Sequence, residues 1–106
     1  MTDRELPQLC RQRAAELKRL RAVVSAGDTD GYRAGLIAQL EAELDRLTPA
    51  LREALNRVQP VSVRPMLYDY YALAMTEAEL CARYDRSARW LRRLRADALE
   101  QLTLSR

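Results

Sequence analysis

The stretch TEAELCARYDRSARWLRRLRADALEQL, residues 76–102, contains the pattern that decides the fold. It predicts two helices joined by a tight turn. Between residues 83 and 95 there are six arginines and one acidic residue, Asp85. A short helix, a turn and a second helix rich in basic side chains are typical of a helix-turn-helix, which lays its second helix in the DNA major groove.

Local signals mark the ends of these two helices. Thr76 and Glu79 have the spacing of a capping box, in which each side chain accepts a hydrogen bond from the other residue's backbone N–H. Asp85 stands where the turn requires a residue that tolerates the left-handed backbone region. Ser87 is a favourable N-cap for the helix that follows. We therefore expect a helix of about two turns, a turn, and a second helix over 87–102.

The second predicted helix carries one apolar stripe, formed by Leu91, Leu94, Ala98, Leu99 and Leu102. The residues off this stripe are expected to face outward, where a recognition helix meets bases and phosphates. We expect three arginines of the first two turns to contact base edges or phosphates, and three flanking arginines to neutralise phosphates. The candidate DNA-binding residues are Arg83, Arg86, Ser87, Arg89, Trp90, Arg92, Arg93 and Arg95.

Two alternatives stay open for this segment. An arginine-rich amphipathic helix at the end of a chain is often a solvated face, but agreement among cap, turn and register favours the DNA-binding motif. Trp90 lies off the apolar stripe. It either folds back over Tyr84 or the neighbouring hairpin, or it contacts the sugar–phosphate wall or a thymine methyl group.

The same residues resemble the fourth region of bacterial sigma factors. The matching positions are Thr76, Leu80, Ser87, Leu91, Leu94 and the Ala98-Leu99-x-x-Leu102 ending. The preceding stretch, LYDYYALAMT, is similar to the lead-in of small phage and prophage regulators of the ArpU and RinA kind, with Leu67, Tyr71 and Thr76 matching. Asp85 stands where the family usually has a glycine. The resemblance covers roughly residues 67–102 and implies transcription control by DNA binding near promoters.

Composition indicates a small helical protein. The chain has 106 residues, with no Phe, three Gly and four Pro, which suits one domain or one domain with an extension. The net charge of +3 is too small to require a nucleic-acid partner. All basic residues except Lys18 are arginine, the residue best suited to bidentate contacts with guanine and phosphate.

Several function classes are disfavoured. The chain has no His, and its two cysteines, Cys10 and Cys81, are far apart, so we expect reduced buried thiols, no metal site and no cofactor. It has no glycine-rich phosphate loop and no nucleophile beside a base, so we expect no enzyme. No apolar run is long enough for a membrane span, and MTDRELPQL is not a signal peptide. We therefore expect a protein of the cytoplasm of a bacterium or a phage-infected cell.

The N-terminal half has a different character. Residues 4–26 predict a polar helix with scattered apolar positions and with Pro7 in its first turn. The loop AGDTDG, residues 26–31, follows it. Thr48-Pro49 predicts a kink or a short break in the next helix. That helix carries a heptad seam formed by Ile37, Leu40, Leu44, Leu47, Leu51, Ala54 and Val58.

These observations predict an all-α protein in two segments. Residues 1–58 form a coiled-coil-like helical hairpin, and residues 59–106 form a three-helix domain with the helix-turn-helix. The boundary is the proline-bearing stretch QPVSVRP, residues 59–65, and Pro65 begins the first helix of the second domain. The hairpin packs either within the chain or against a second copy, and its long seam favours a homodimer. We expect the tyrosines at 68, 70 and 71 to pack in the core and at its rim rather than to stack on bases.

The predicted function is sequence-specific binding of double-stranded DNA by a transcriptional regulator encoded by a phage or prophage. RNA polymerase or another host protein is a further expected partner. The alternative is a protein-interaction module on a helix-turn-helix scaffold, such as an inhibitor of a host factor or host defence, or a packaging adaptor. The two functions predict different salt dependence of binding, because contacts with DNA phosphates release counterions and apolar contacts with a protein do not.

Overall fold

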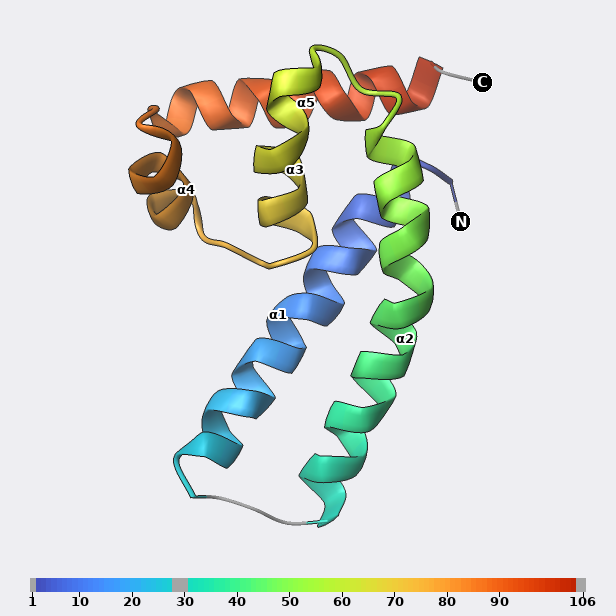
Figure 1. Cartoon of the computed structure of the whole chain (residues 1–106), viewed down its shortest axis with the longest axis vertical. Coiled ribbons are helices and arrows are strands. Elements are labelled where there is room, and N and C mark those ends of the chain that lie inside the picture. Colours follow the sequence, from blue (N-terminus) through green and yellow to red (C-terminus); the bar gives the residue numbers. More distant parts are fainter. Residues whose placement is uncertain (1, 28–30, 105–106) are drawn as a thin grey trace.

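The computed structural model describes residues 2–27 and 31–104 (Figure 1). Over these ranges the chain is helical and has no β-strand, so the predicted all-α class is confirmed. The helices are α1 (Glu5–Ser25), α2 (Gly31–Leu55), the short 3-10 helix η1 (Val61–Val63), α3 (Arg64–Tyr71), α4 (Glu77–Tyr84) and α5 (Ala88–Leu104).

The first helix begins and ends close to the predicted positions. Reciprocal hydrogen bonds between Thr2 and Glu5 precede its first turn, and Pro7 lies within that turn, as expected. The helix ends at Ser25, and Gly27 then adopts a φ of 98°, a conformation that favours glycine. Residues 28–30 of the predicted loop lie outside the described residues.

The second helix runs from Gly31 to Leu55 without interruption. Of the two alternatives predicted at Thr48-Pro49, a kink or a short break, the break is therefore wrong and the kink stays a prediction. Proline removes one hydrogen bond from a helix, but Pro49 is on the exposed side, where water can satisfy the carbonyl of Asp45. The helix retains its packing through Leu51 and Leu55, which are buried on the opposite side.

The helices α1 and α2 lie side by side and run in opposite directions (Figure 1). The Nε atom of Arg13 is 2.9 Å from Oε1 of Glu43, and this pairing raises the pKa of Arg13. Near the far end Arg21 lies 3.7 Å from Glu41. The halves of α1 and α2 nearest residues 25–31 extend beyond the other helices (Figure 1).

One cluster of buried side chains joins the two predicted segments. The end of the hairpin where α1 begins and α2 ends packs against α3 and α5, and α5 lies across this end (Figure 1). The cluster shows that the apolar seam of α2 is partly covered within the chain. Its members are Leu6, Cys10, Leu51, Ala54, Leu55, Val58, Val63, Met66, Leu67, Tyr71, Leu80, Leu91, Ala98 and Leu102.

The connection between α2 and α3 is fixed by a side chain of α5. Gln101 accepts a hydrogen bond from the backbone N–H of Gln59 and donates one to the carbonyl oxygen of Gln59, both over 2.8 Å. Pro65 then lies in the first turn of α3, as predicted. The amide of Gln101 satisfies both backbone groups of Gln59 where the connection has no helical partners.

The junction between the hairpin and α3 contains an arginine and a tyrosine pair. Nη1 of Arg11 donates hydrogen bonds to the carbonyl oxygens of Tyr70 and Met75, the second over 2.9 Å. Its guanidinium carbon also lies 3.7 Å from the centre of the Tyr70 ring. Tyr71 is buried beside Tyr70, and Tyr68 is half-buried. These positions agree with the predicted core and rim packing of the three tyrosines.

Candidate nucleic-acid interface

The first turn of α4 has the predicted capping box. Oγ1 of Thr76 accepts from the N–H of Glu79 over 3.1 Å, and Oε1 of Glu79 accepts from the N–H of Thr76 over 2.9 Å. The hydrogen bond from the Thr76 backbone lowers the pKa of Glu79, because it stabilises the carboxylate. The start of α4 is thus fixed by residues adjacent in sequence.

The connection from α4 to α5 also agrees with the local signals. Asp85 has φ 53° and ψ 51°, the left-handed conformation predicted for the turn. The N–H of Arg86 donates to the carbonyl oxygen of Cys81 over 3.3 Å. Oγ of Ser87 accepts from the N–H of Trp90 over 3.1 Å, which makes Ser87 the N-cap of α5.

Three of the five residues in the predicted apolar stripe of α5 are buried, and Leu94 and Leu99 are half-buried. Leu91 is fully buried, Ala98 and Leu102 are 2% exposed, and Leu94 is half-buried against the core. Three arginines, Arg89, Arg92 and Arg93, are exposed. The prediction that they face outward is confirmed.

The outward-facing arginines differ in their partners. Arg92 lies 3.0 Å from Oε2 of Glu77, the first residue of α4. Among residues 2–27 and 31–104, no ion pair or hydrogen bond joins the side chain of Arg89 or Arg93 to another group. Arg89 and Arg93 are one helical turn apart, so their guanidinium groups lie on the same face of α5.

Two other arginines flank this face. Arg86, in the turn, has its guanidinium carbon 4.9 Å from the centre of the Trp90 ring. Arg83, near the end of α4, lies 3.5 Å from a carboxylate oxygen of Asp69 but keeps 57% of its side chain exposed. Both side chains are exposed at the same end of α5 as Arg89.

Arg95 does not join this surface. Its side chain is only 16% exposed, and its guanidinium carbon lies 4.2 Å from the centre of the Tyr70 ring. Nη2 of Arg95 is 3.9 Å from Glu77, whereas Nη1 is buried without a hydrogen-bond partner among the described residues. Contacts with α3 and α4 hold Arg95 inward, which the helical periodicity of α5 alone does not reveal.

Trp90 is half-buried and packs against the core, and Arg86 covers its ring. The geometry thus agrees with the packing alternative considered for this residue. Packing leaves one edge of the side chain accessible, because a half-buried indole still exposes part of its surface. Trp90 supports the surface on which Arg86 lies.

A buried carboxylate anchors α4 to α3. Asp69 is 7% exposed and accepts a hydrogen bond from the hydroxyl of Tyr84. Burial, followed by this hydrogen bond, raises the pKa of Tyr84 to about 12. Asp69 and Glu77 were not recognised from the sequence, because both are defined by partners on other helices.

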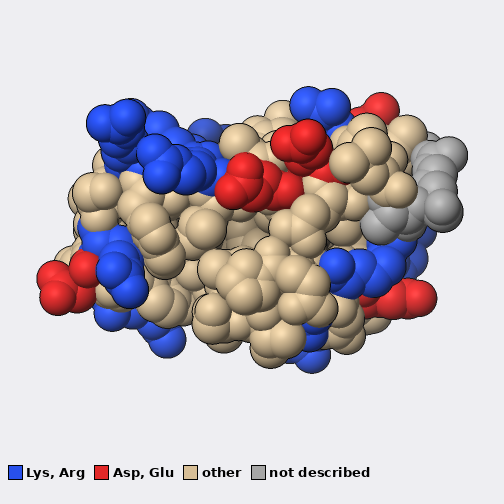
Figure 2. Space-filling model, turned by 90° about the horizontal axis from the view of Figure 1, so that it is seen from above, with Lys and Arg blue, Asp and Glu red and all other residues tan. Residues whose placement is uncertain are grey.

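Charge is unevenly distributed on the face that includes α5. Figure 2 shows Lys and Arg side chains gathered over the end where α4 meets α5, with acidic side chains at its edge and others nearer the middle. Along α5, Arg89, Arg92 and Arg93 are followed by Asp97 and Glu100. A helix dipole favours the reverse order, by about 0.3–1 kcal/mol for each exposed charge near an end. Helix stability therefore does not account for this arrangement.

Other kinds of site have little basis in the described ranges. No group of three or more metal-ligating side chains occurs among residues 2–27 and 31–104. Cys10 is buried, and burial raises the pKa of its thiol to about 11; Cys81 is half-buried, and both are free thiols. None of the helices in the described part of the chain has the length and apolar character needed to cross a membrane.

Comparison of the chain with protein-family models, curated proteins and solved structures found no match.

Proposed function

We propose that this chain is a sequence-specific double-stranded DNA-binding protein that regulates transcription, with α4 and α5 acting as a helix-turn-helix. The observation that carries the proposal is the pair Arg89 and Arg93, exposed in the first two turns of α5 and without a partner among the described residues. An exposed pair of uncompensated guanidinium groups on one helix face suits contacts with guanine edges or phosphates.

The dimensions of α5 support entry into a major groove. An α-helix with its side chains is about 10–12 Å in diameter, which fits a major groove about 12 Å wide. Ser87 and Arg89, at the start of the helix, are exposed to solvent. In this arrangement Arg89 and Arg93 contact base edges or phosphates, and Arg83 and Arg86 neutralise the phosphates on either side.

The remaining candidates have smaller roles in the proposal. Arg92 must leave Glu77 before it can contact DNA, so we expect it to contribute less than Arg89 and Arg93. Trp90 positions Arg86 through the stacked guanidinium. Arg95 acts inside the protein, where it contacts Tyr70 and Glu77.

The sequence resemblance supports transcription as the process. The likeness of residues 67–102 to sigma-factor region 4 and to small phage regulators covers the segment that presents the exposed arginines. It favours a prophage or phage regulator that works beside RNA polymerase. The buried core positions that match this resemblance, Leu80 and Leu91, are both fully buried.

The decisive experiment compares two double variants of equal charge. Arg89→Ala with Arg93→Ala should weaken binding to duplex DNA flanking the gene by roughly 10- to 100-fold, and should flatten the salt dependence by about two units in log–log slope. Arg19→Ala with Arg46→Ala removes the same charge from exposed positions on α1 and α2 and should have little effect. Fluorescence anisotropy over a salt series measures both quantities, and thermal unfolding followed by circular dichroism checks the fold.

Two outcomes would contradict the proposal. Unchanged binding by a folded Arg89/Arg93 variant would remove α5 from the interface. Equal loss in both double variants would mean that the duplex responds to overall charge alone.

The homodimer remains part of the proposal. Leu36, Ile37 and Leu44 on α2 are only half-buried, so part of their apolar surface stays open to a second copy. A second hairpin would complete a four-helix arrangement and place two copies of α5 on a pseudo-palindromic site. Light scattering over a concentration series tests this, since a constant monomer mass would indicate a single-site reader.

One observation favours the alternative of a protein-interaction module. Glu77 and Glu79 place negative charge in the first turn of α4, beside the basic face of α5. These carboxylates oppose phosphate approach, although Arg92 and Lys18 partly compensate them. Retention of a protein partner at high salt, with no duplex binding at low salt, would establish the alternative.

A further inference from the structure

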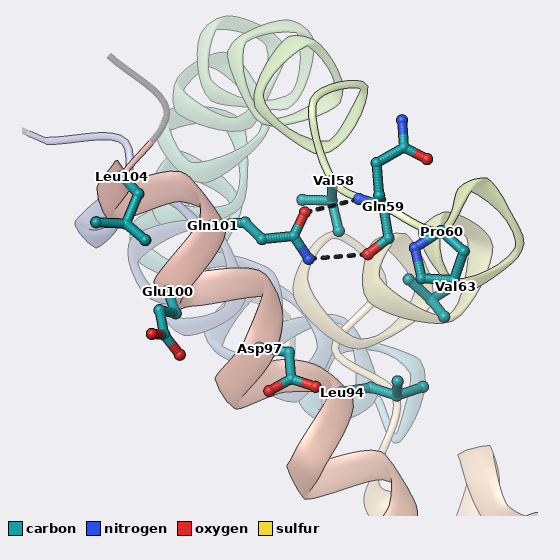
Figure 3. Close-up of a pocket in the computed structure, with 9 residues that line it drawn as sticks. All are labelled: Val58, Gln59, Pro60, Val63, Leu94, Asp97, Glu100, Gln101 and Leu104. Atoms are coloured by element: carbon teal, nitrogen blue, oxygen red, sulfur yellow. Dashed lines mark hydrogen bonds between the residues drawn. The ribbon is translucent and has the colours of Figure 1, made fainter.

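The C-terminal half of α5, beyond the exposed arginines, borders a small pocket (Figure 3). The pocket has a volume of about 320 Å³ and lies between α5 and the connection that leads from α2 to η1. Its apolar surface comes from Val58, Pro60, Val63, Leu94 and Leu104. Val58 and Val63 are buried, whereas Leu104 is 74% exposed. Leu104 therefore adds exposed apolar surface at the edge of the pocket, next to its buried valine walls.

The polar groups deep in the pocket are already satisfied. The side chain of Gln101 and the backbone of Gln59 bind each other through two hydrogen bonds of 2.8 Å (Figure 3). This double contact holds the wall of the pocket in place and leaves few unsatisfied donors facing inward. The pocket is therefore preorganised for an aliphatic side chain rather than for a polar ligand.

The rim of the pocket is acidic. Asp97 and Glu100 lie three residues apart on α5, so both carboxylates project from one side of the helix. Neither carboxylate forms an ion pair or hydrogen bond within the parts of the chain that the structure describes. None of the nine residues that line the pocket is basic, although the whole chain carries a net charge of +3.

We propose that this pocket docks an amphipathic helix of a partner protein, with a leucine in the pocket and arginine or lysine beside Asp97 and Glu100. The apolar walls and exposed Leu104 match an aliphatic side chain, and the paired carboxylates match basic residues one turn apart on a helix. The site uses a different part of α5 from Arg89 and Arg93 and is independent of their proposed DNA contacts.

The test uses three alanine-based helical peptides of equal length with a fluorescent label. One has a central leucine with arginines one turn away on each side. The second replaces the arginines with glutamates, and the third replaces the leucine with alanine. The leucine–arginine peptide should bind the full chain about tenfold more tightly than the alanine version and about fivefold more tightly than the glutamate version. Fluorescence anisotropy measures the affinities.

A matched pair of variants separates a specific site from general attraction. Asp97→Asn with Glu100→Gln should weaken binding of the leucine–arginine peptide about fivefold. Asp45→Asn with Glu53→Gln makes the same charge change on α2 and should not weaken it as much. Amide chemical shifts of the labelled full chain should change around Val63, Gln101 and Leu104.

Equal weakening in the two variants, or chemical shifts centred elsewhere, would overturn the proposal. So would equal binding of the leucine and alanine peptides. Self-association that is abolished by the Asp97/Glu100 variant would make a second copy, rather than a partner protein, the occupant of the pocket.

Discussion

The basic side chains of the hairpin and those of α5 have different surroundings. In the hairpin, Arg13 and Arg21 face carboxylates across the helix pair, and Arg11 binds two backbone carbonyls of the α3 region. On α5, Arg89 and Arg93 have no such partner among the described residues. Residue type is the same in both regions. The comparison teaches that lack of a partner alone does not mark a site, because Arg19 and Arg46 of the hairpin are also exposed and unpaired among the described residues. Arg89 and Arg93 differ because they lie one turn apart on one face of the same helix.

The hairpin and the helices α3–α5 share one buried core, so their stabilities are coupled. Arg11 of the hairpin contacts Tyr70 and Met75 beside this core, whereas Arg89 and Arg93 are exposed to solvent. Substitutions in the core should therefore affect both regions equally. Substitution of Arg11 should therefore affect stability, whereas substitution of Arg89 or Arg93 should affect binding.

The largest effect is expected at Leu67 on α3, which is fully buried between the two regions. Leu67→Ala should lower the free energy of unfolding by about 2–5 kcal/mol, through lost apolar contacts and a residual cavity. Leu73→Ala is the control, because Leu73 is 49% exposed. Denaturant unfolding should give one transition by circular dichroism, which follows the helices, and by fluorescence of Trp90. Different denaturation midpoints for the two signals would show that the hairpin and the helices α3–α5 unfold separately and do not share one core.

A second large effect is expected at alkaline pH. Tyr71 lies in the core between the regions, and burial raises its pKa to about 12 despite the nearby Arg95 and Arg11. The folded state favours the neutral phenol, so its contribution is complete below about pH 10 and is lost as the pH rises toward 12. The total loss is of the order of 2 kcal/mol.

Tyr71→Phe should therefore reduce the fall in stability between pH 10 and 12, measured by denaturant unfolding at each pH. Tyr32→Phe, at a residue 76% exposed, should leave the fall unchanged. Cys10 and Tyr84 contribute in the same direction, because their pKa values are also raised. The same alkaline profile for Tyr71→Phe and the unsubstituted protein would show that Tyr71 ionises as freely in the folded chain as in the unfolded one.

Signals within a few residues predicted much of the fold. The capping box of Thr76 and Glu79, the left-handed Asp85 and the N-cap Ser87 are local, and all are present in the structure. Helical periodicity also located the buried stripe of α5 around Leu91. These features depend on residues close together in the sequence, so a single amino-acid sequence is sufficient to predict them.

Features that depend on distant residues were missed. Glu77 pairs with Arg92 and approaches Arg95, and nothing in the neighbourhood of Glu77 in the sequence indicates these partners. Of the kink or short break predicted at Pro49, the break is absent, because burial of the other side of α2 outweighs one lost hydrogen bond. Periodicity defined a surface of arginines but did not show that Arg95 turns inward toward Tyr70.

The contrast between paired and unpaired arginines predicts different effects on stability. Arg11→Ala leaves the carbonyl oxygens of Tyr70 and Met75 without a donor and should cost about 1–3 kcal/mol. Arg89→Ala should change stability by no more than about 0.5 kcal/mol, because the side chain is exposed. Thermal and denaturant unfolding measure both variants. Comparable losses would remove the distinction between the two regions.

The smallest effect concerns the turn that presents the basic face. Asp85 occupies the left-handed region at φ 53°, which costs a non-glycine residue energy that glycine does not pay. Asp85→Gly should raise stability by about 0.5 kcal/mol, because relief of strain exceeds the greater entropy of glycine in the unfolded chain. The control is Gly27→Ala, which imposes the opposite change at a φ of 98° and should destabilise the hairpin end.

The same turn should also affect DNA binding, because it sets the position of Arg89 and Arg93. Asp85→Gly should leave affinity nearly unchanged, because glycine adopts the same conformation, whereas Asp85→Val should weaken it. Equal affinity for the glycine and valine variants would show that the turn does not set the position of Arg89 and Arg93.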